Sequence, residues 1–287
     1  MGLQIIEMMK AAQQCGNAAH VPALLAACGV APTAAQAQAP VERWRQALAL
    51  LALHVPLARR SLAAGRPIQH AGDPFLRLHL INGGACKSVC FGGDGRQQIV
   101  ALHFRGDWIG FDGIADDRCA SDASTLNDCE IWSVSYATVL KLAAREPALA
   151  HLIAAAMSEQ LGRNRAWRNV LGTLTAVQRV ADFLHGWQTT RHEQRPEDDR
   201  IVLYLTRAEI GNYLGLTIET VSRAFSHLEH CGLIRILPQG RRHIGIPDRG
   251  ALRRFAALTV GRGAPSASHQ PSRTPRPALS VVRALSH

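Results

Sequence analysis

The sequence has few aromatic residues and lacks any long hydrophobic run. Phe, Trp and Tyr make up 5% of the 287 residues, although 47% of all residues are hydrophobic. A membrane-spanning helix needs about 18 or more consecutive apolar residues, and the sequence contains no such stretch. We therefore expect a cytoplasmic globular protein with no transmembrane helix and no membrane partner.

Compact catalytic and metal-binding motifs are also missing. The 13 histidines form no H-E-x-x-H pattern, and the seven cysteines form no C-x2-C pattern. Cysteine or histidine catalysis needs a nucleophile beside a base, or closely spaced metal ligands, so we predict that the chain is not an enzyme. The odd, scattered cysteines fit reduced thiols better than a disulfide framework. Metal or cluster ligation stays open.

Acidic residues are scarce. Asp and Glu number 22 against 32 Lys and Arg, which gives a formal net charge of +10. A basic surplus of this size favours polyanionic partners such as nucleic acid, although composition alone does not exclude a membrane surface.

The length allows two domains, each with its own core. Composition and periodicity predict five segments: a variable N-terminal arm (1–45), a β-rich domain (46–140), a segment with a long helix (141–174), a domain of short helices and a strand pair (175–258) and a disordered basic tail (259–287).

The region 46–140 shows strand patterns, and a helical pattern follows it. Apolar runs at 76–81, 99–104 and 131–134 are separated by glycine-rich turns, which predicts a β-barrel or sandwich. A helix is expected over 147–174, with Pro147 in its first turn. A helix of this length usually packs against a second chain, so we predict a homodimer. A long core helix within a monomer is the alternative.

The most informative segment is 206–231. Thr206 and Glu209 form a capping box that starts a helix. Gly211 allows a second helix to approach, Gly215 permits a tight turn, and Val221 fills the core between the helices. This spacing predicts a helix-turn-helix.

The second helix of this motif is predicted to read DNA. Thr217 caps its start, and it ends near 230. Glu219, Ser222 and Arg223 share one face near the N-terminal end, where they can reach base edges in the major groove. The alternative is that Glu219 and Arg223 only form a solvated ion pair.

A β-hairpin wing is expected around 233–246. The turn 238–240 lies between two apolar runs, and Arg241 and Arg242 are available for phosphates. The candidate DNA-binding residues are Thr206, Thr217, Glu219, Thr220, Ser222, Arg223, Arg241 and Arg242.

These residues resemble the CRP/FNR family over roughly 62–258. The segment LTRAEIGNYLGLTIETVSR is similar to the FNR branch, and LHLINGGACKSVCFGGDGRQQIVALHFRGDWIGFDGI is similar to the β-roll of the family. The resemblance implies an α+β fold. In it, a sensor domain with a β-roll of the cyclic-nucleotide-binding jelly-roll type (46–140) precedes a long dimerisation helix (141–174) and a winged helix-turn-helix DNA-binding domain (175–258).

The resemblance also implies a function. The E-x-x-S-R pattern of the FNR branch maps onto Glu219, Ser222 and Arg223, which implies a palindrome close to TTGAT-N4-ATCAA in double-stranded DNA. A regulator of this kind controls anaerobic, microaerobic or redox-responsive genes. It activates transcription through RNA polymerase or represses by occupying promoters.

Cyclic AMP is not expected as the effector. The CRP-type pocket requires a glutamate and an Arg-Ser pair, and 106–128 contains no such combination. The adjacent Asp116 and Asp117 would repel a phosphate.

The FNR branch implies a [4Fe-4S] cluster, for which four thiolates are the usual ligands. The context NDCEIWSV places Cys129 at the internal ligand position, and Cys15 and Cys28 are the N-terminal candidates. A further ligand would come from His20, a carboxylate, Cys86 or Cys90. The alternatives are gating by thiol oxidation, haem or another small molecule, and effector-independent action as in FixK-like regulators.

Overall fold

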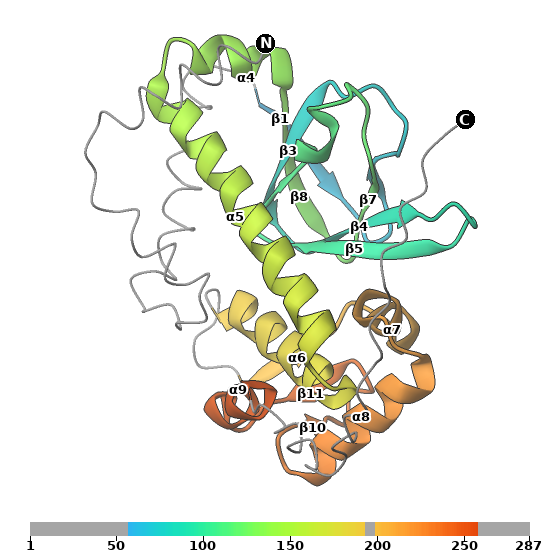
Figure 1. Cartoon of the computed structure of the whole chain (residues 1–287). Coiled ribbons are helices and arrows are strands. Elements are labelled where there is room, and N and C mark those ends of the chain that lie inside the picture. Colours follow the sequence, from blue (N-terminus) through green and yellow to red (C-terminus); the bar gives the residue numbers. More distant parts are fainter. Residues whose placement is uncertain (1–56, 193–198, 258–287) are drawn as a thin grey trace, which may run out of the picture. The chain divides into compact units, whose positions relative to one another are not determined.

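The computed structural model describes residues 57–192 and 199–257 (Figure 1). The predicted N-terminal arm, the start of the predicted sensor domain and the predicted tail lie outside the described residues. Cys15, His20 and Cys28 lie outside them as well.

The β-roll consists of two antiparallel sheets, with strand orders β1-β8-β3-β6 and β2-β7-β4-β5. The runs at 76–81, 99–104 and 131–134, where we predicted strands, correspond to β3, β5 and β8. The eight strands are β1 (Ala58–Leu62), β2 (Pro67–Gln69), β3 (Arg77–Gly83), β4 (Cys86–Phe91), β5 (Gln97–His103), β6 (Trp108–Ile109), β7 (Asp122–Thr125) and β8 (Cys129–Ser135).

Apolar side chains of both sheets meet in the interior of the roll. Ile81 and Ile131 are fully buried in one core cluster, together with Cys86. Leu78 and Trp108 belong to a second cluster. A short 3-10 helix, η2 (Phe111–Gly113), follows β6.

The pairing of β4 with β5 contains a bulge. Ser88 and Val89 are consecutive in β4, but their partners Ala101 and Ile99 are two positions apart, so the extra residue lies in β5. Along β4, Cys86 is fully buried and Cys90 is half-buried. The two cysteines therefore have different surroundings although they lie on the same strand.

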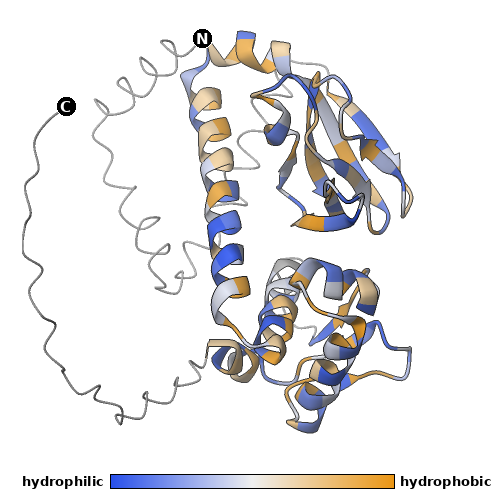
Figure 2. Cartoon of the chain, turned by 45° about the vertical axis from the view of Figure 1, so that its right-hand side comes forward, coloured by the Kyte–Doolittle hydropathy of each residue, from blue (hydrophilic) through white to orange (hydrophobic). Residues whose placement is uncertain are grey.

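Two helices follow the roll. The first, α4 (Tyr136–Ala143), was not predicted. The second, α5 (Pro147–Thr173), is the expected long helix, with proline at its first position. Figure 2 shows hydrophobic residues in the first turns of α5 and hydrophilic residues further along. Within the described structure, Leu149 and Leu152 are the buried residues of this helix.

The C-terminal part combines helices with a small sheet of order β10-β11-β9. Its helices are α6 (Ala176–His192), α7 (Arg207–Leu214), α8 (Ile218–His230) and α9 (Arg249–Ala257), and its strands are β9 (Arg200–Val202), β10 (Arg235–Ile236) and β11 (His243–Gly245). Helix α6 is longer than the short helices predicted there, and β9 adds a strand to the predicted pair.

The core of this part is apolar, and an arginine of α6 connects the ends of α5 and α7. Leu184 of α6, Ile210 of α7 and Phe225 of α8 are buried in one cluster. The Arg179 guanidinium donates hydrogen bonds to the carbonyl oxygens of Leu171 (2.6 Å), Leu174 (3.1 Å) and Leu214 (3.3 Å). Carbonyl groups at helix ends lack intrahelical partners, so this side chain satisfies the ends of α5 and α7 together.

Candidate DNA-binding site

Helix α7 begins with the predicted capping box. The Thr206 Oγ1 accepts a hydrogen bond from the Glu209 backbone N–H (3.2 Å), and the Thr206 backbone N–H donates to the Glu209 carboxylate (2.8 Å). Two backbone amides at the helix start are thereby satisfied. The sequence prediction for this helix start is confirmed.

The turn between α7 and α8 depends on two glycines. A Cβ on Gly211 would lie 2.6 Å from the Leu216 carbonyl oxygen, so a larger residue does not fit. Gly215 caps α7 in the left-handed region at φ 64°, which glycine adopts without steric cost. Val221 is fully buried. The helix-turn-helix is confirmed, although Gly211 makes room for the backbone of the turn rather than for the second helix.

Helix α8 has two distinct faces. The Thr217 side chain accepts from the Thr220 backbone N–H (3.2 Å) and caps its start. One face is buried and consists of Val221, Ala224, Phe225 and Leu228. Glu219, Ser222 and Arg223 are exposed. The packing of one face fixes the helix so that these three polar side chains point into solvent together.

The exposed side chains of Glu219, Ser222 and Arg223 keep polar groups available for contact with DNA. In the described part of the chain, no ion pair joins Glu219 to Arg223, so the alternative of a mutual salt bridge is not observed. Hydrogen bonds from its own backbone amide and from Thr217, together with the charge of Arg223, lower the pKa of the Glu219 carboxyl. The Ser222 hydroxyl donates to the Ile218 carbonyl oxygen (2.9 Å) and keeps its acceptor lone pairs.

The three threonines among the candidates have local partners. The Thr206 Oγ1 also donates to the Glu209 carboxylate (2.9 Å), and the Thr217 and Thr220 hydroxyls lie 3.0 Å apart. Thr206 and Thr217 are exposed, whereas Thr220 is half-buried. Their observed contacts are those of helix caps.

The predicted wing is present. Strands β10 and β11 pair antiparallel, and Gly240 lies in the turn between them at φ 120°. Arg241 and Arg242 are exposed at the end of this turn. The structure therefore brings two unburied guanidinium groups to the same domain as the exposed face of α8.

Sequence reasoning missed Arg207, which connects the wing to the helices. Its guanidinium carbon lies 3.2 Å from the centroid of the Phe225 ring, and its Nη2 donates to the Arg241 carbonyl oxygen (3.2 Å). Burial, together with the charge of Arg241, lowers the pKa of Arg207 to about 10. The only local signal was its place directly after the N-cap residue.

Helix α7 also contacts the β-roll. The Lys87 ammonium lies 2.6 Å from the Glu209 carboxylate. The Asn212 side chain accepts from the Ile99 backbone N–H (2.6 Å) and donates to the Gln97 carbonyl oxygen (2.7 Å). Asn212 thus satisfies two backbone groups of β5, a strand at the edge of its sheet.

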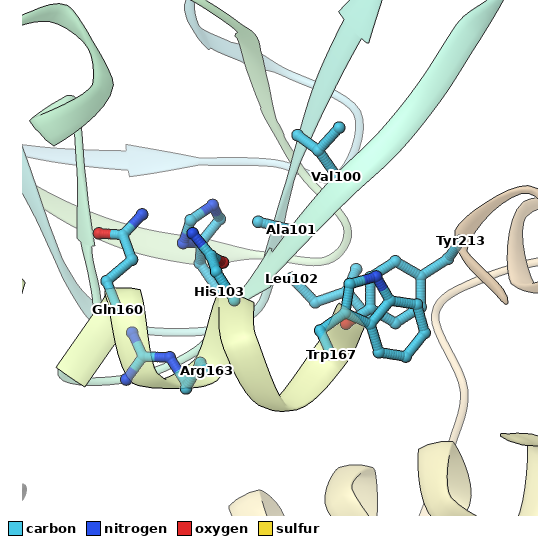
Figure 3. A pocket seen from close by; sticks show the side chains of 9 residues that line it. Val100, Ala101, Leu102, His103, Gln160, Arg163, Trp167 and Tyr213 are labelled. Carbon is cyan, nitrogen blue, oxygen red and sulfur yellow. The ribbon is translucent and has the colours of Figure 1, made fainter. Parts of the chain in front are cut away.

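A small cavity lies between β5, α5 and α7 (Figure 3). Its volume is about 70 Å³, and its polar lining includes His103, Gln160, Arg163 and Asn164. Pockets for small molecules usually measure about 300–1,000 Å³. The cavity as shaped here has room for a few water molecules and is too small for a nucleotide.

The cysteines of the β-roll bear on the implied cluster. Cys129 lies with its sulfur 3.7 Å from that of Cys86. Their hydrogen bond lowers the pKa of the Cys129 thiol and raises that of Cys86. Among residues 57–192 and 199–257, no group of three or more Cys, His, Asp or Glu side chains could hold a metal ion. These residues alone therefore do not supply four thiolates, and the cluster stays a prediction.

The remaining described cysteines lie elsewhere. Cys119 is buried in the core cluster around Leu78, and the half-buried Cys90 points its sulfur toward the Ala120 carbonyl oxygen (3.8 Å). Cys231 is exposed at the end of α8, 3.7 Å from the His227 ring. Among the described helices, none is both long and apolar enough to cross a membrane.

Comparison with protein-family models identifies two domains. Residues 59–146 match the cyclic nucleotide-binding domain, and residues 178–255 match the Crp-like helix-turn-helix domain. The first match covers the strands of the roll, and the second covers α7, α8 and the wing.

Curated relatives and a solved structure agree with these matches. A probable transcriptional activator of Rhizobium leguminosarum is 35% identical over 197 residues, which are 69% of this chain and 80% of that protein. The transcriptional regulatory protein btr of Bordetella pertussis is 31% identical over 183 residues, 64% of this chain and 76% of that protein. The structure of FixK2 from Bradyrhizobium japonicum has a TM-score of 0.62 at 28% identity and covers 70% of this chain and 98% of that one. The chain therefore belongs to the CRP/FNR family of DNA-binding transcription regulators.

Proposed function

We propose that the protein binds a palindrome close to TTGAT-N4-ATCAA and reads each half-site with Glu219, Ser222 and Arg223 of α8. The observation that carries the proposal is the common exposure of these side chains near the N-terminal end of a helix whose opposite face is buried. Arginine can donate two hydrogen bonds to guanine, and an ionised glutamate can accept from the amino group of cytosine. The lowered pKa of Glu219 keeps it ionised for this contact.

The wing would add affinity without adding sequence preference. Arg241 and Arg242 are exposed, and arginine contacts to phosphate position a protein on DNA without reading its sequence. Thr206, Thr217 and Thr220 would contact the backbone near the helix starts. We assign recognition to α8 and the wing within 175–258, sensing to 46–140 and dimerisation to 141–174.

The long helix α5 supports a homodimer. It runs for 27 residues, and Leu161 in its second half is 58% exposed. An exposed leucine on such a helix is suited to burial against a second copy. A dimer would present two α8 helices to the two halves of a palindrome.

The names of relatives point to the class of target genes. Proteins 29% to 32% identical to this chain include the fumarate and nitrate reduction regulatory protein of Escherichia coli and the anaerobic regulatory protein of Haemophilus influenzae. By this likeness the chain would control anaerobic, microaerobic or redox-linked genes from the cytoplasm. It would act through contact with RNA polymerase or by occupying promoters, with no catalytic activity of its own.

The proposal is tested by fluorescence anisotropy with a labelled palindrome and a scrambled duplex. The unaltered protein should prefer the palindrome, and Arg223→Ala should lose that preference, because each bidentate contact contributes about 1–3 kcal/mol of discrimination. Arg96→Ala serves as the control, since this exposed arginine lies in the β-roll beside Asp94. An Arg223→Ala protein with unchanged preference would refute the residue assignment.

A further inference from the structure

Two cysteines from opposite sheets of the β-roll face each other in its interior. Cys86 is the first residue of β4, and Cys129 is the first residue of β8. Their sulfur atoms lie 3.7 Å apart, which is direct contact. Gly84 leaves room for this arrangement, because a Cβ at that position would overlap the Cys129 sulfur.

The surroundings favour chemistry between the two thiols. Cys86 and Cys129 belong to the same apolar cluster, whereas Cys119 belongs to a different one and Cys90 is only half-buried. Within the described ranges, no third potential ligand joins the pair to form a metal site. Two contacting thiols are all that a disulfide requires from the protein.

We propose that Cys86 and Cys129 are a redox-active dithiol that hydrogen peroxide converts into a disulfide between the two sheets. The Cys129 thiolate attacks one peroxide oxygen, the O–O bond breaks, and the departing hydroxide takes up a proton to become water. The Cys86 sulfur then attacks the resulting sulfenic acid, the S–O bond breaks and the S–S bond forms. The Cys86 proton leaves with the hydroxyl group as a second water. Two thiols are oxidised and one peroxide is reduced.

The geometry makes this closure a local event. A disulfide requires a sulfur separation of about 2.05 Å, so the sulfur atoms must approach by about 1.7 Å from their observed 3.7 Å. Both cysteines stand at strand starts, next to turns that can shift more easily than strand centres. Cys129 is 5% exposed and Cys86 is fully buried. A small oxidant such as hydrogen peroxide can therefore reach the Cys129 sulfur more easily than a bulky disulfide reagent can.

In the test, the reduced, metal-free full-length protein is treated with hydrogen peroxide, and its free thiols and disulfide-linked peptides are then identified. This measurement does not depend on DNA binding. In denaturant the seven thiols should fall to five and return to seven with dithiothreitol. Trypsin without reduction should yield peptide 78–87 linked to peptide 119–141. Because the second peptide contains both Cys119 and Cys129, the Cys119→Ser protein should retain the link.

Matched variants locate the bond. Cys86→Ala should abolish the linked pair of peptides, while Cys90→Ser on the same strand should retain it. The proposal is wrong if peroxide leaves Cys86 and Cys129 as free thiols while it oxidises other cysteines. It is also wrong if the linked peptides involve Cys119 or Cys90. The measurement on the unaltered protein decides between these outcomes even where a variant fails to fold.

Discussion

Gly211 and the Leu216 carbonyl oxygen approach so closely that a Cβ on residue 211 would lie 2.6 Å from that oxygen. The oxygen belongs to the backbone of the turn and cannot rotate away as a side chain could. We predict that Gly211→Ala destabilises the DNA-binding domain by about 1–3 kcal/mol, the usual cost of overpacking. Urea unfolding monitored by circular dichroism measures this difference.

The control for Gly211→Ala is Gly186→Ala in α6. A Cβ at Gly186 meets nothing within 4 Å, and alanine is favoured over glycine in helix interiors by about 0.5–1 kcal/mol. This control should therefore be neutral or stabilising. Equal effects of the two substitutions would contradict the close approach in the turn.

The wing arginines should control the salt dependence of DNA binding. We expect the double substitution Arg241→Ala/Arg242→Ala to weaken binding to specific and scrambled DNA alike. The slope of log affinity against log salt should become shallower by about 0.9 for each phosphate that the protein no longer neutralises. Anisotropy titrations at several salt concentrations give this slope.

Arg66→Ala/Arg96→Ala removes the same charge from exposed positions of the β-roll. If the wing contacts phosphates, this control should leave the slope almost unchanged. Two double variants with the same slope would mean that the wing does not contact the DNA.

The predicted dimer interface includes Leu161 of α5. Burying a charge without a partner is costly, so Leu161→Glu should convert dimers into monomers of about 31.1 kDa. Light scattering coupled to size-exclusion chromatography measures the mass. Leu140→Glu changes another exposed leucine, on α4, and should leave the dimer intact. A Leu161→Glu protein that remains fully dimeric would place the interface elsewhere.

Acid should destabilise the β-roll through His79. Burial, together with the charges of Arg60 and Arg77, lowers the pKa of His79 from 6.5 to about 4. The unfolded chain therefore binds a proton between pH 6.5 and 4 that the folded chain does not bind. Protonation of His79 therefore does not affect the free energy of unfolding above pH 6.5. As the pH falls from 6.5 to about 4, the free energy of unfolding decreases by about 3 kcal/mol.

The contribution of His79 is isolated with His79→Gln, since glutamine does not titrate. The free energy of unfolding of the unaltered protein should fall more steeply than that of the variant between pH 6.5 and 4.5. Parallel profiles for His79→Gln and the unaltered protein would rule out this role of His79.

Local signals explain what the sequence predicted correctly. The capping box at Thr206, the glycine at 215 and the periodicity of α8 are each set by residues within one or two helical turns. The same is true of the proline that starts α5. Such features are encoded by neighbouring residues and can be read without knowledge of the tertiary structure.

Other features depend on residues that are distant in the sequence. The bulge in β5 arises from pairing with β4, and β9 has three residues whose strand conformation depends on β11. Cys86 and Cys129 are 43 positions apart and meet because two sheets pack together. No local pattern distinguishes Cys86 from Cys90, so only the fold could assign them different surroundings.

The most direct test of the central claim replaces the single G·C pair of each TTGAT half-site and measures affinity by anisotropy. If Arg223 reads this guanine, the substitution should weaken binding of the unaltered protein by about 1–3 kcal/mol per half-site. The same base change should have almost no further effect on Arg223→Ala. Equal losses for both proteins would contradict base recognition by α8 through Arg223.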